Sequence, residues 1–154
     1  MSRYSLVKPN EGPNYNWALD HTFVKVSSGD TGGAYTVMED NLKLEFSLGL
    51  HVHHRTAETF YILEGSVDFY IDGDWMTATQ GTTVHIPAGI EHALQLPGSD
   101  TAKMLMVMQP AGFDLFLAEM AAMSEADLGD AALMKARSEH YDIFTLGGVP
   151  SRAA

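Results

Sequence analysis

The stretch "LHVHHRTAETFYILEG", residues 50–65, places three histidines and a glutamate at the head of an apolar run. In an extended strand successive side chains point to opposite faces, so His51 and His53 share one face and His54 lies on the other. Two imidazoles about 7 Å apart along a strand can lean together onto one metal ion. In a strand, the spacing His-x-His therefore suits two ligands of one metal ion. By itself the pair also fits two histidines on the protein surface.

The same alternation brings a carboxylate to the inward face. In "ETFYIL", Glu58 shares a face with Phe60 and Ile62, and an ionised carboxylate facing an apolar interior is costly unless it is paired or binds a metal. Further on, His92 begins a run in which Leu94 occupies the same face. His92 can therefore also point into an apolar interior.

The middle of the chain is rich in short strand-like runs separated by turn residues, from about residue 20 to 109. Many short strand-like runs separated by turn residues predict an all-β sandwich or barrel. The pair Asp72-Gly73 lies between two alternating runs and predicts a tight hairpin, because glycine tolerates the positive φ of such turns. The runs are "HTFVKV", "AYTVME", "LKLEFSL", "ETFYIL", "SVDFYI", "WMTAT", "TTVHIP", "HALQLP" and "AKMLMVMQ".

The pattern changes to helical spacing after Pro110. "GFDLFLAEMAAM", residues 112–123, predicts one amphipathic helix, and "SEADLGDAALMKARSEHY", residues 124–141, predicts a second that opens with a capping box of Ser124 and Asp127. Their apolar faces need a surface to cover, so we expect them outside the β unit or in a dimer contact. "LGGVPSRAA", residues 146–154, is interpreted as a loose tail.

Composition limits the class of protein. With 154 residues and 45% hydrophobic residues, we expect one domain over 1–154, with a barrel over about 20–109 and a helical extension and tail over about 110–154. A net charge of −11, with nine scattered Lys and Arg, argues against nucleic acid as a partner. The chain has no cysteine, no membrane-spanning apolar stretch and no signal-peptide core in "MSRYSLVKPNEGP", so a cytoplasmic location is expected.

Two segments carry a family resemblance. "HVHHRTAETFYILEG" resembles the first cupin motif, and "GTTVHIPAGIEH" resembles the second. The resemblance covers roughly residues 36–109 and implies an all-β fold, the cupin double-stranded β-helix or jelly-roll barrel, here followed by a C-terminal α-helical extension. It also implies one divalent metal ion held by His51, His53, Glu58 and His92. The alternative is a metal-free barrel in which the four form a hydrogen-bonded cluster. The matching positions are His51, His53, Glu58, Gly65, Gly81, Pro87, Gly89 and His92.

Two positions depart from the motifs. The leading glycine of the first motif is Glu45 here, so the entry to that strand can be shaped differently, and the asparagine often found after the second motif is Leu96, which leaves a more apolar wall. We expect a substrate pocket, with ordinary core packing as the alternative for each member. Its candidate residues are Phe46, Phe60, Ile62, Leu94, Met104 and Met106.

Three further polar residues are assigned outside the site. By alternation Tyr61 points opposite to Glu58, which favours packing over catalysis. His54 faces away from the site and suits a surface or interface role. His85, next to apolar neighbours, is interpreted as a satisfied core or edge residue.

The extension is similar to that of small single-domain cupins related to quercetin 2,3-dioxygenase. A six-coordinate ion with four protein ligands keeps two positions for substrate and dioxygen, so with Fe, Mn, Ni, Co or Cu we expect a dioxygenase of a small aromatic or enolisable molecule, with Glu58 as catalytic base. The alternatives are a non-redox isomerase, cyclase or lyase in which the ion, for example Zn, acts as a Lewis acid, and a non-enzymatic small-molecule binder. A homodimer is expected, because small cupin barrels resemble those that pair through their sheets.

Overall fold

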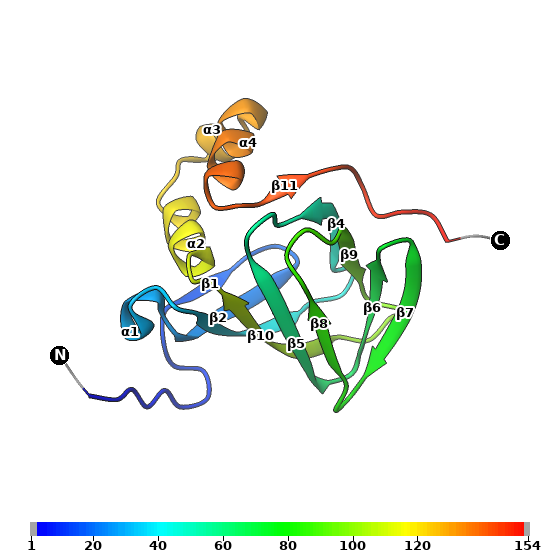
Figure 1. The fold of residues 1–154 in the computed structure, drawn as a ribbon, viewed down its shortest axis with the longest axis horizontal. Helices are drawn as coiled ribbons and strands as arrows, with labels where there is room; N and C mark the ends of the chain where they lie inside the picture. Colours follow the sequence, from blue (N-terminus) through cyan, green and yellow to red (C-terminus); the bar gives the residue numbers. More distant parts are fainter. Residues whose placement is uncertain (1–2, 153–154) are drawn as a thin grey trace.

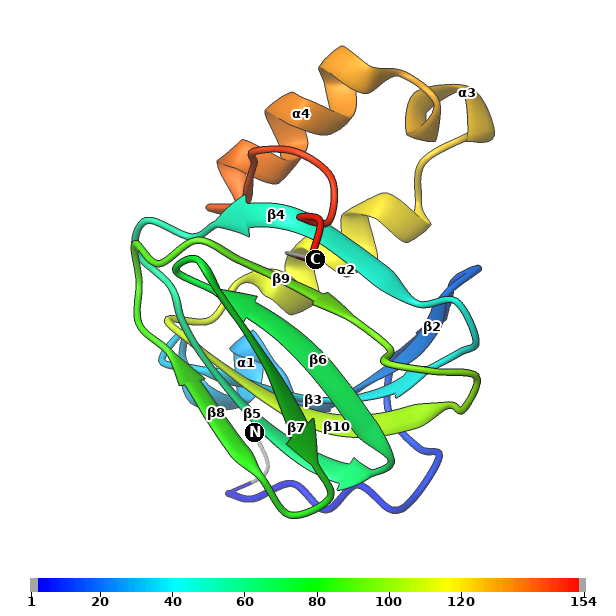
Figure 2. The same cartoon turned by 90° about the vertical axis from the view of Figure 1, so that its right-hand side faces the viewer.

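The computed structural model describes residues 3–152, which fold into two antiparallel β-sheets packed face to face (Figures 1 and 2). The six-stranded sheet has the order β1-β2-β3-β10-β5-β8 and the five-stranded sheet the order β11-β4-β9-β6-β7. This arrangement confirms the expected mostly-β fold. The strands are β1 (Asn14–Asn16), β2 (Asp20–Val26), β3 (Thr36–Leu42), β4 (Ser47–Val52), β5 (Ala57–Glu64), β6 (Ser66–Ile71), β7 (Asp74–Thr79), β8 (Thr83–Ile86), β9 (His92–Gln95), β10 (Ala102–Gln109) and β11 (Phe144–Thr145).

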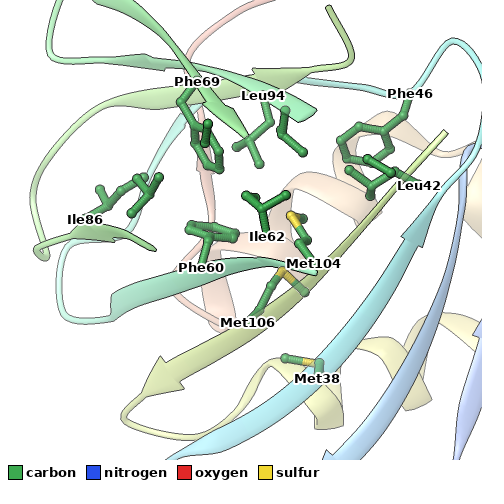
Figure 3. Packing of buried hydrophobic residues seen from close by; sticks show 14 of the residues in the cluster. Met38, Leu42, Phe46, Phe60, Ile62, Phe69, Ile86, Leu94, Met104 and Met106 are labelled. Atoms are coloured by element: carbon green, nitrogen blue, oxygen red, sulfur yellow. The ribbon is translucent and has the colours of Figure 1, made fainter. Parts of the chain in front are cut away.

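The core lies between the sheets and follows the period of two in the sequence. In β5, Phe60 and Ile62 are buried while Tyr61 between them is exposed. Figure 3 shows Phe60 and Ile62 pointing across the gap toward Phe69 and Leu94 of the opposite sheet. A one-residue slip would turn each of these side chains to solvent, so burial of one face sets the strand register.

The Asp72-Gly73 hairpin is confirmed. Asp72 has φ 49° and Gly73 has φ 97°, and the two residues join β6 to β7, whose end residues Ile71 and Asp74 pair. Positive φ at both central positions is the signature of the type I′ turn, which matches the twist of the flanking strands.

One expected strand is wrong. The run "LKLEFSL" does not form a single strand, because β3 ends at Leu42 and β4 begins at Ser47. Between them the chain turns, with the Phe46 N–H donating to the Lys43 carbonyl over 3.1 Å and Glu45 at φ 67°. A left-handed residue cannot continue a strand, so the apolar alternation here crosses a turn.

The helices are α1 (Ser28–Thr31), α2 (Phe113–Ala121), α3 (Glu125–Leu128) and α4 (Ala131–His140). The prediction of one continuous helix over residues 124–141 is therefore wrong, because this segment forms two helices, α3 and α4. The capping box of Ser124 and Asp127 is present, but it begins only the single turn of α3. Asp130 then caps α4, because its Oδ1 accepts the N–H groups of Ala132 and Leu133, each over 3.1 Å. A second cap inside the run stops the first helix and starts the next.

The tail is held against the five-stranded sheet rather than loose. The N–H groups of Leu146 and Gly147 both donate to the Leu50 carbonyl, over 2.8 and 3.2 Å. Near the end, Arg152 pairs with the buried Asp68. Residues 153–154 of the expected tail, and the first two residues of the chain, lie outside the described part. Within residues 3–152, no helix is long and apolar enough to cross a membrane.

Candidate metal centre

Four polar side chains meet between the two sheets. His51 lies in β4 and His92 in β9, where the two residues pair across the strands, while Glu58 comes from β5 of the opposite sheet. His53 follows directly after the end of β4. All four side chains are buried, and one nitrogen or oxygen atom of each lies within 4.8 Å of those of the others. The structure thus brings together the four residues that the resemblance implied as ligands.

Backbone carbonyls orient the three imidazoles. The Nδ1 atom of His51 lies 2.7 Å from the Gly49 carbonyl oxygen, that of His92 lies 2.9 Å from the Ile90 oxygen, and that of His53 lies 2.9 Å from the Asp142 oxygen. A carbonyl oxygen can only accept a hydrogen bond, so each Nδ1 carries the proton. In the neutral imidazole the lone pair is then on Nε2, as metal ligation requires.

The Nε2 atoms and the carboxylate form a set of acceptors that a cation would satisfy. Glu58 Oε2 lies 2.7 Å from His92 Nε2 and 3.3 Å from His53 Nε2. Within residues 3–152, His53 Nε2 is buried and has no hydrogen-bond partner. Lone pairs in this proximity repel unless a proton or a metal ion lies among them. The residues therefore fit one divalent ion.

The titration of the cluster also suits metal binding. Burial, followed by the neighbouring charge of His92, lowers the pKa of His51 to about 4. Burial acts to raise the pKa of Glu58, but the close His53 and His92 rings outweigh burial and hold this pKa well below its ordinary value. The same contact with Glu58 outweighs burial at His53 and raises its pKa. At neutral pH the site thus offers an ionised carboxylate beside a neutral His51.

A cavity of about 620 Å³ opens beside the cluster and includes His51, His53 and Glu58 in its wall. Its lining contains five of the residues that we expected in the pocket. Ile62, the sixth, is fully buried in the core and is absent from the cavity lining formed by the described residues. The five are Phe46, Phe60, Leu94, Met104 and Met106.

Comparison with known proteins identifies the family of this β unit. The cupin domain family matches residues 42–108, a segment that contains all four clustered side chains. This segment is a cupin domain. Over 66 residues the chain is 36% identical to quercetin 2,3-dioxygenase of Bacillus subtilis, a match that covers 43% of the chain and 19% of that enzyme. Over 74 residues it is 32% identical to mannose-1-phosphate guanylyltransferase of Escherichia coli, covering 48% of the chain and 16% of that enzyme. The chain thus matches less than a fifth of the length of either relative.

Solved structures share the cupin fold at low sequence identity. KdgF from Halomonas superposes with a TM-score of 0.63 at 12% identity, covering 73% of this chain and 98% of that one. A variant of Streptomyces PAC13 with uridine superposes with a TM-score of 0.61 at 15% identity, covering 97% of this chain and 95% of that one. These likenesses concern the fold, and the second extends over nearly the whole chain.

The helical extension contributes to the cavity wall, a role that we did not predict from the sequence. Phe113, Phe116, Leu117 and Met120 of α2 line the cavity beside the cupin domain, as does Ile143 after α4. The helical spacing of the apolar residues in α2 was the available signal. We interpreted it as packing outside the β unit or as a dimer contact, because periodicity defines an apolar face without identifying the surface that covers it.

A pair of aspartates in the cavity wall was also missed. Asp20 and Asp40 both line the cavity, and Thr22 Oγ1 lies 3.1 Å from Asp40 Oδ1 and 3.5 Å from Asp20 Oδ2. Burial, and then the charge of Asp20, raises the pKa of Asp40 to about 8. Burial likewise raises the pKa of Asp20. The pairing of β2 with β3 places Thr22 opposite Asp40, a neighbourhood with no local sequence signal.

The remaining histidines and Tyr61 lie apart from the cluster. His54 is exposed, with its ring 4.5 Å from that of Phe144. His85 is exposed on the edge strand β8, where its Nδ1 lies 2.8 Å from Thr59 Oγ1. Tyr61 is 42% exposed on the outer face of the six-stranded sheet.

Proposed function

We propose that this protein is a metal-dependent cupin enzyme and that it catalyses a quercetinase-like dioxygenation of a small aromatic or enolisable molecule. The observation that carries the proposal is the convergence of three imidazoles and one carboxylate, of which His51, His53 and Glu58 lie in the wall of a mostly apolar cavity. The volume of this cavity lies within the range of small-molecule binding sites, about 300–1,000 Å³. Aromatic side chains such as Phe46 and Phe60 suit a flat, apolar substrate and exclude water.

His51, His53, Glu58 and His92 would hold one divalent ion. Fe, Mn, Ni, Co or Cu would supply redox chemistry when bound, and Zn would supply Lewis-acid polarisation. Glu58 lies in the cavity wall, so its carboxylate is placed to accept the proton of an enolisable substrate. The carbonyls of Gly49, Ile90 and Asp142 hold the imidazoles in one tautomer.

Elemental analysis of protein purified without oxygen tests the proposal, followed by oxygen-uptake assays with flavonols and β-diketones. We expect a redox-active metal at about one ion per chain, together with oxygen uptake on at least one of these substrates. A double variant, His51→Ala with His92→Ala, should lose both metal and uptake. Zinc alone, with no oxygen uptake on any of these substrates, would contradict a dioxygenase.

The aspartate pair favours a second candidate, a non-redox isomerase, cyclase or lyase. Asp40 keeps a proton at neutral pH, so the cavity holds a carboxylic acid in addition to the carboxylate of Glu58. Two groups in opposite protonation states are what a proton-transfer reaction needs. Exchange of β-diketone protons with D₂O in the absence of oxygen distinguishes the candidates. Exchange that is lost in Asp40→Asn while the metal stays bound would favour the second.

A further inference from the structure

We propose that Asp142 positions the metal ligand His53, so that the segment after α4 completes a metal site whose ligands all lie in the cupin domain. The inference rests on the proposed metal binding. It assigns to the C-terminal extension a role at the metal centre as well as in the cavity wall.

The support of His53 differs from that of the other two histidines. His51 and His92 are each oriented by a carbonyl two positions earlier in their own chain segment, Gly49 and Ile90. His53 is oriented by the carbonyl of Asp142, which is 89 positions away in sequence. His53 also lies one residue beyond the end of β4, outside the regular ladder. Its ring orientation therefore depends on a distant segment.

The Asp142 carboxylate binds the loop that joins His53 to Glu58. Its Oδ1 accepts the His54 N–H over 3.0 Å. Its Oδ2 accepts the Arg55 N–H over 2.8 Å and both the N–H and the hydroxyl of Thr56 over 2.9 Å. The side chain is buried, and these hydrogen bonds outweigh the effect of burial and lower its pKa. One residue thus holds the loop with its carboxylate and His53 with its carbonyl.

The backbone around Asp142 is anchored on both sides. Before it, the Asp142 N–H donates to the Glu139 carbonyl over 3.1 Å, at the end of α4. After it, Phe144 of β11 pairs with Val52 in β4, next to His53. Asp142 itself has φ 64°, a left-handed conformation that asparagine and glycine also adopt readily. Substitutions to these two residues therefore remove the carboxylate without forcing the backbone to move.

The test compares Asp142→Asn and Asp142→Gly with the wild type, using Co²⁺ as the probe metal. Asparagine keeps one acceptor oxygen, but its amide nitrogen cannot accept the bonds that Oδ2 accepts. We expect both variants to bind Co²⁺ at least about tenfold more weakly, with an altered visible spectrum of the bound cobalt. In metal-free protein, imidazole ¹⁵N NMR should show a changed His53 tautomer balance and unchanged signals for His51 and His92.

Asp130→Ala is the matched control. Asp130 is an acidic residue of the same extension, and its Oδ1 accepts from Ala132 and Leu133 of α4, whereas the loop after His53 donates to Asp142. This variant should keep the cobalt affinity and spectrum of the wild type. An equal loss of affinity in Asp130→Ala would overturn the proposal, because the effect would then be general destabilisation.

Failure of this inference and failure of the proposed function give different results. Wild-type cobalt affinity, cobalt spectrum and His53 ¹⁵N signal in both Asp142 variants would overturn the positioning role. If the wild type binds no cobalt at all, the proposed function fails. A His53 signal that still changes in metal-free Asp142→Asn would then support the positioning role by itself.

Discussion

At the metal centre, individual residues differ in what their loss should do. Each histidine offers an Nε2 lone pair from a buried, carbonyl-oriented ring, so loss of one removes a fixed nitrogen donor and leaves a gap in the donor set. We expect His51→Ala or His92→Ala to strip the metal from purified protein, measured by elemental analysis. Glu58→Ala should weaken binding less than it impairs catalysis, because it also removes the proposed base.

Two other histidines are controls for this experiment. His54→Ala and His85→Ala remove exposed rings outside the cluster, so both variants should keep their metal. Unchanged metal content in the double variant of His51 and His92 would refute the site itself.

Asp40 should make stability depend on pH. Burial, and then the charge of Asp20, raises its pKa in the folded protein to about 8, whereas the pKa of an unfolded aspartate is about 3.9. Between these values the folded state holds a proton that the unfolded state has lost, so the contribution of Asp40 to stability falls as pH rises through the window. The slope for one proton is at most about 1.4 kcal/mol per pH unit. Above about pH 8 the loss is complete.

Urea unfolding at several pH values checks this effect. Asp40→Asn cannot titrate, so its stability relative to the wild type should rise between pH 4 and about pH 8. Glu39→Gln, on the adjacent position of β3 where the side chain is less buried, is the control and should run parallel to the wild type. A constant difference between Asp40→Asn and the wild type across this window would show that Asp40 does not carry the proton.

At the scale of elements, two turn positions with positive φ differ in residue type: one is a glutamate and the other a glycine. Glu45 has φ 67° at a position where the cupin motif has glycine, and Gly65 has φ 74°. The left-handed conformation costs an L-residue about 1–2 kcal/mol, of which the greater unfolded-state entropy of glycine offsets about 0.4–1 kcal/mol. We therefore expect Glu45→Gly to stabilise the protein by about 0.5–1 kcal/mol in urea unfolding.

Gly65→Ala is the opposite case. A Cβ atom there would lie 2.7 Å from the Thr101 carbonyl oxygen, so strain and a backbone clash act together. We expect a loss of about 1–3 kcal/mol. Stabilisation by Gly65→Ala, or destabilisation by Glu45→Gly, would contradict the backbone geometry of these turns.

Whether a turn or helix end could be predicted from the sequence depended on how clearly neighbouring residues encode its backbone conformation. The Asp72-Gly73 turn was predictable because two adjacent residues carry its conformation. The division of the second helix was also encoded locally, since Gly129 and the capping residue Asp130 lie inside the run that we took as continuous. The break between β3 and β4 had a weaker signal, because Glu45 is not a residue that usually marks positive φ.

At the scale of the whole molecule, the outer face of the six-stranded sheet supports the proposed homodimer. Tyr61 is 42% exposed and pairs across the strands with Leu105, and Val107 pairs with Val37 in the same sheet. Leu105, Val107 and Val37 are partly buried and alternate with core residues, so they lie on the outer face with Tyr61. These four side chains form an apolar strip on a face that also carries Glu39, opposite Leu105, and such a strip suits a two-fold interface.

Sedimentation equilibrium tests this assembly. We expect a mass twice the 16.8 kDa of the chain, and a shift toward monomer in Tyr61→Glu, which places a charge in the apolar face. Met76→Glu changes a side chain of similar exposure, 43%, on β7 of the other sheet and should leave the dimer intact. A monomeric wild type, or equal dissociation of both variants, would contradict pairing through this face.

The sequence by itself determined the β architecture, the tight hairpin and the inward face that carries His51, Glu58 and His92. These features follow from strand alternation and turn chemistry, which act between residues a few positions apart. Only the tertiary structure decided that α2 lines the cavity, that Asp20 and Asp40 meet, and that Asp142 orients His53. Each of these contacts joins segments far apart in the chain, and local periodicity says which face of an element is buried but not which other segment buries it.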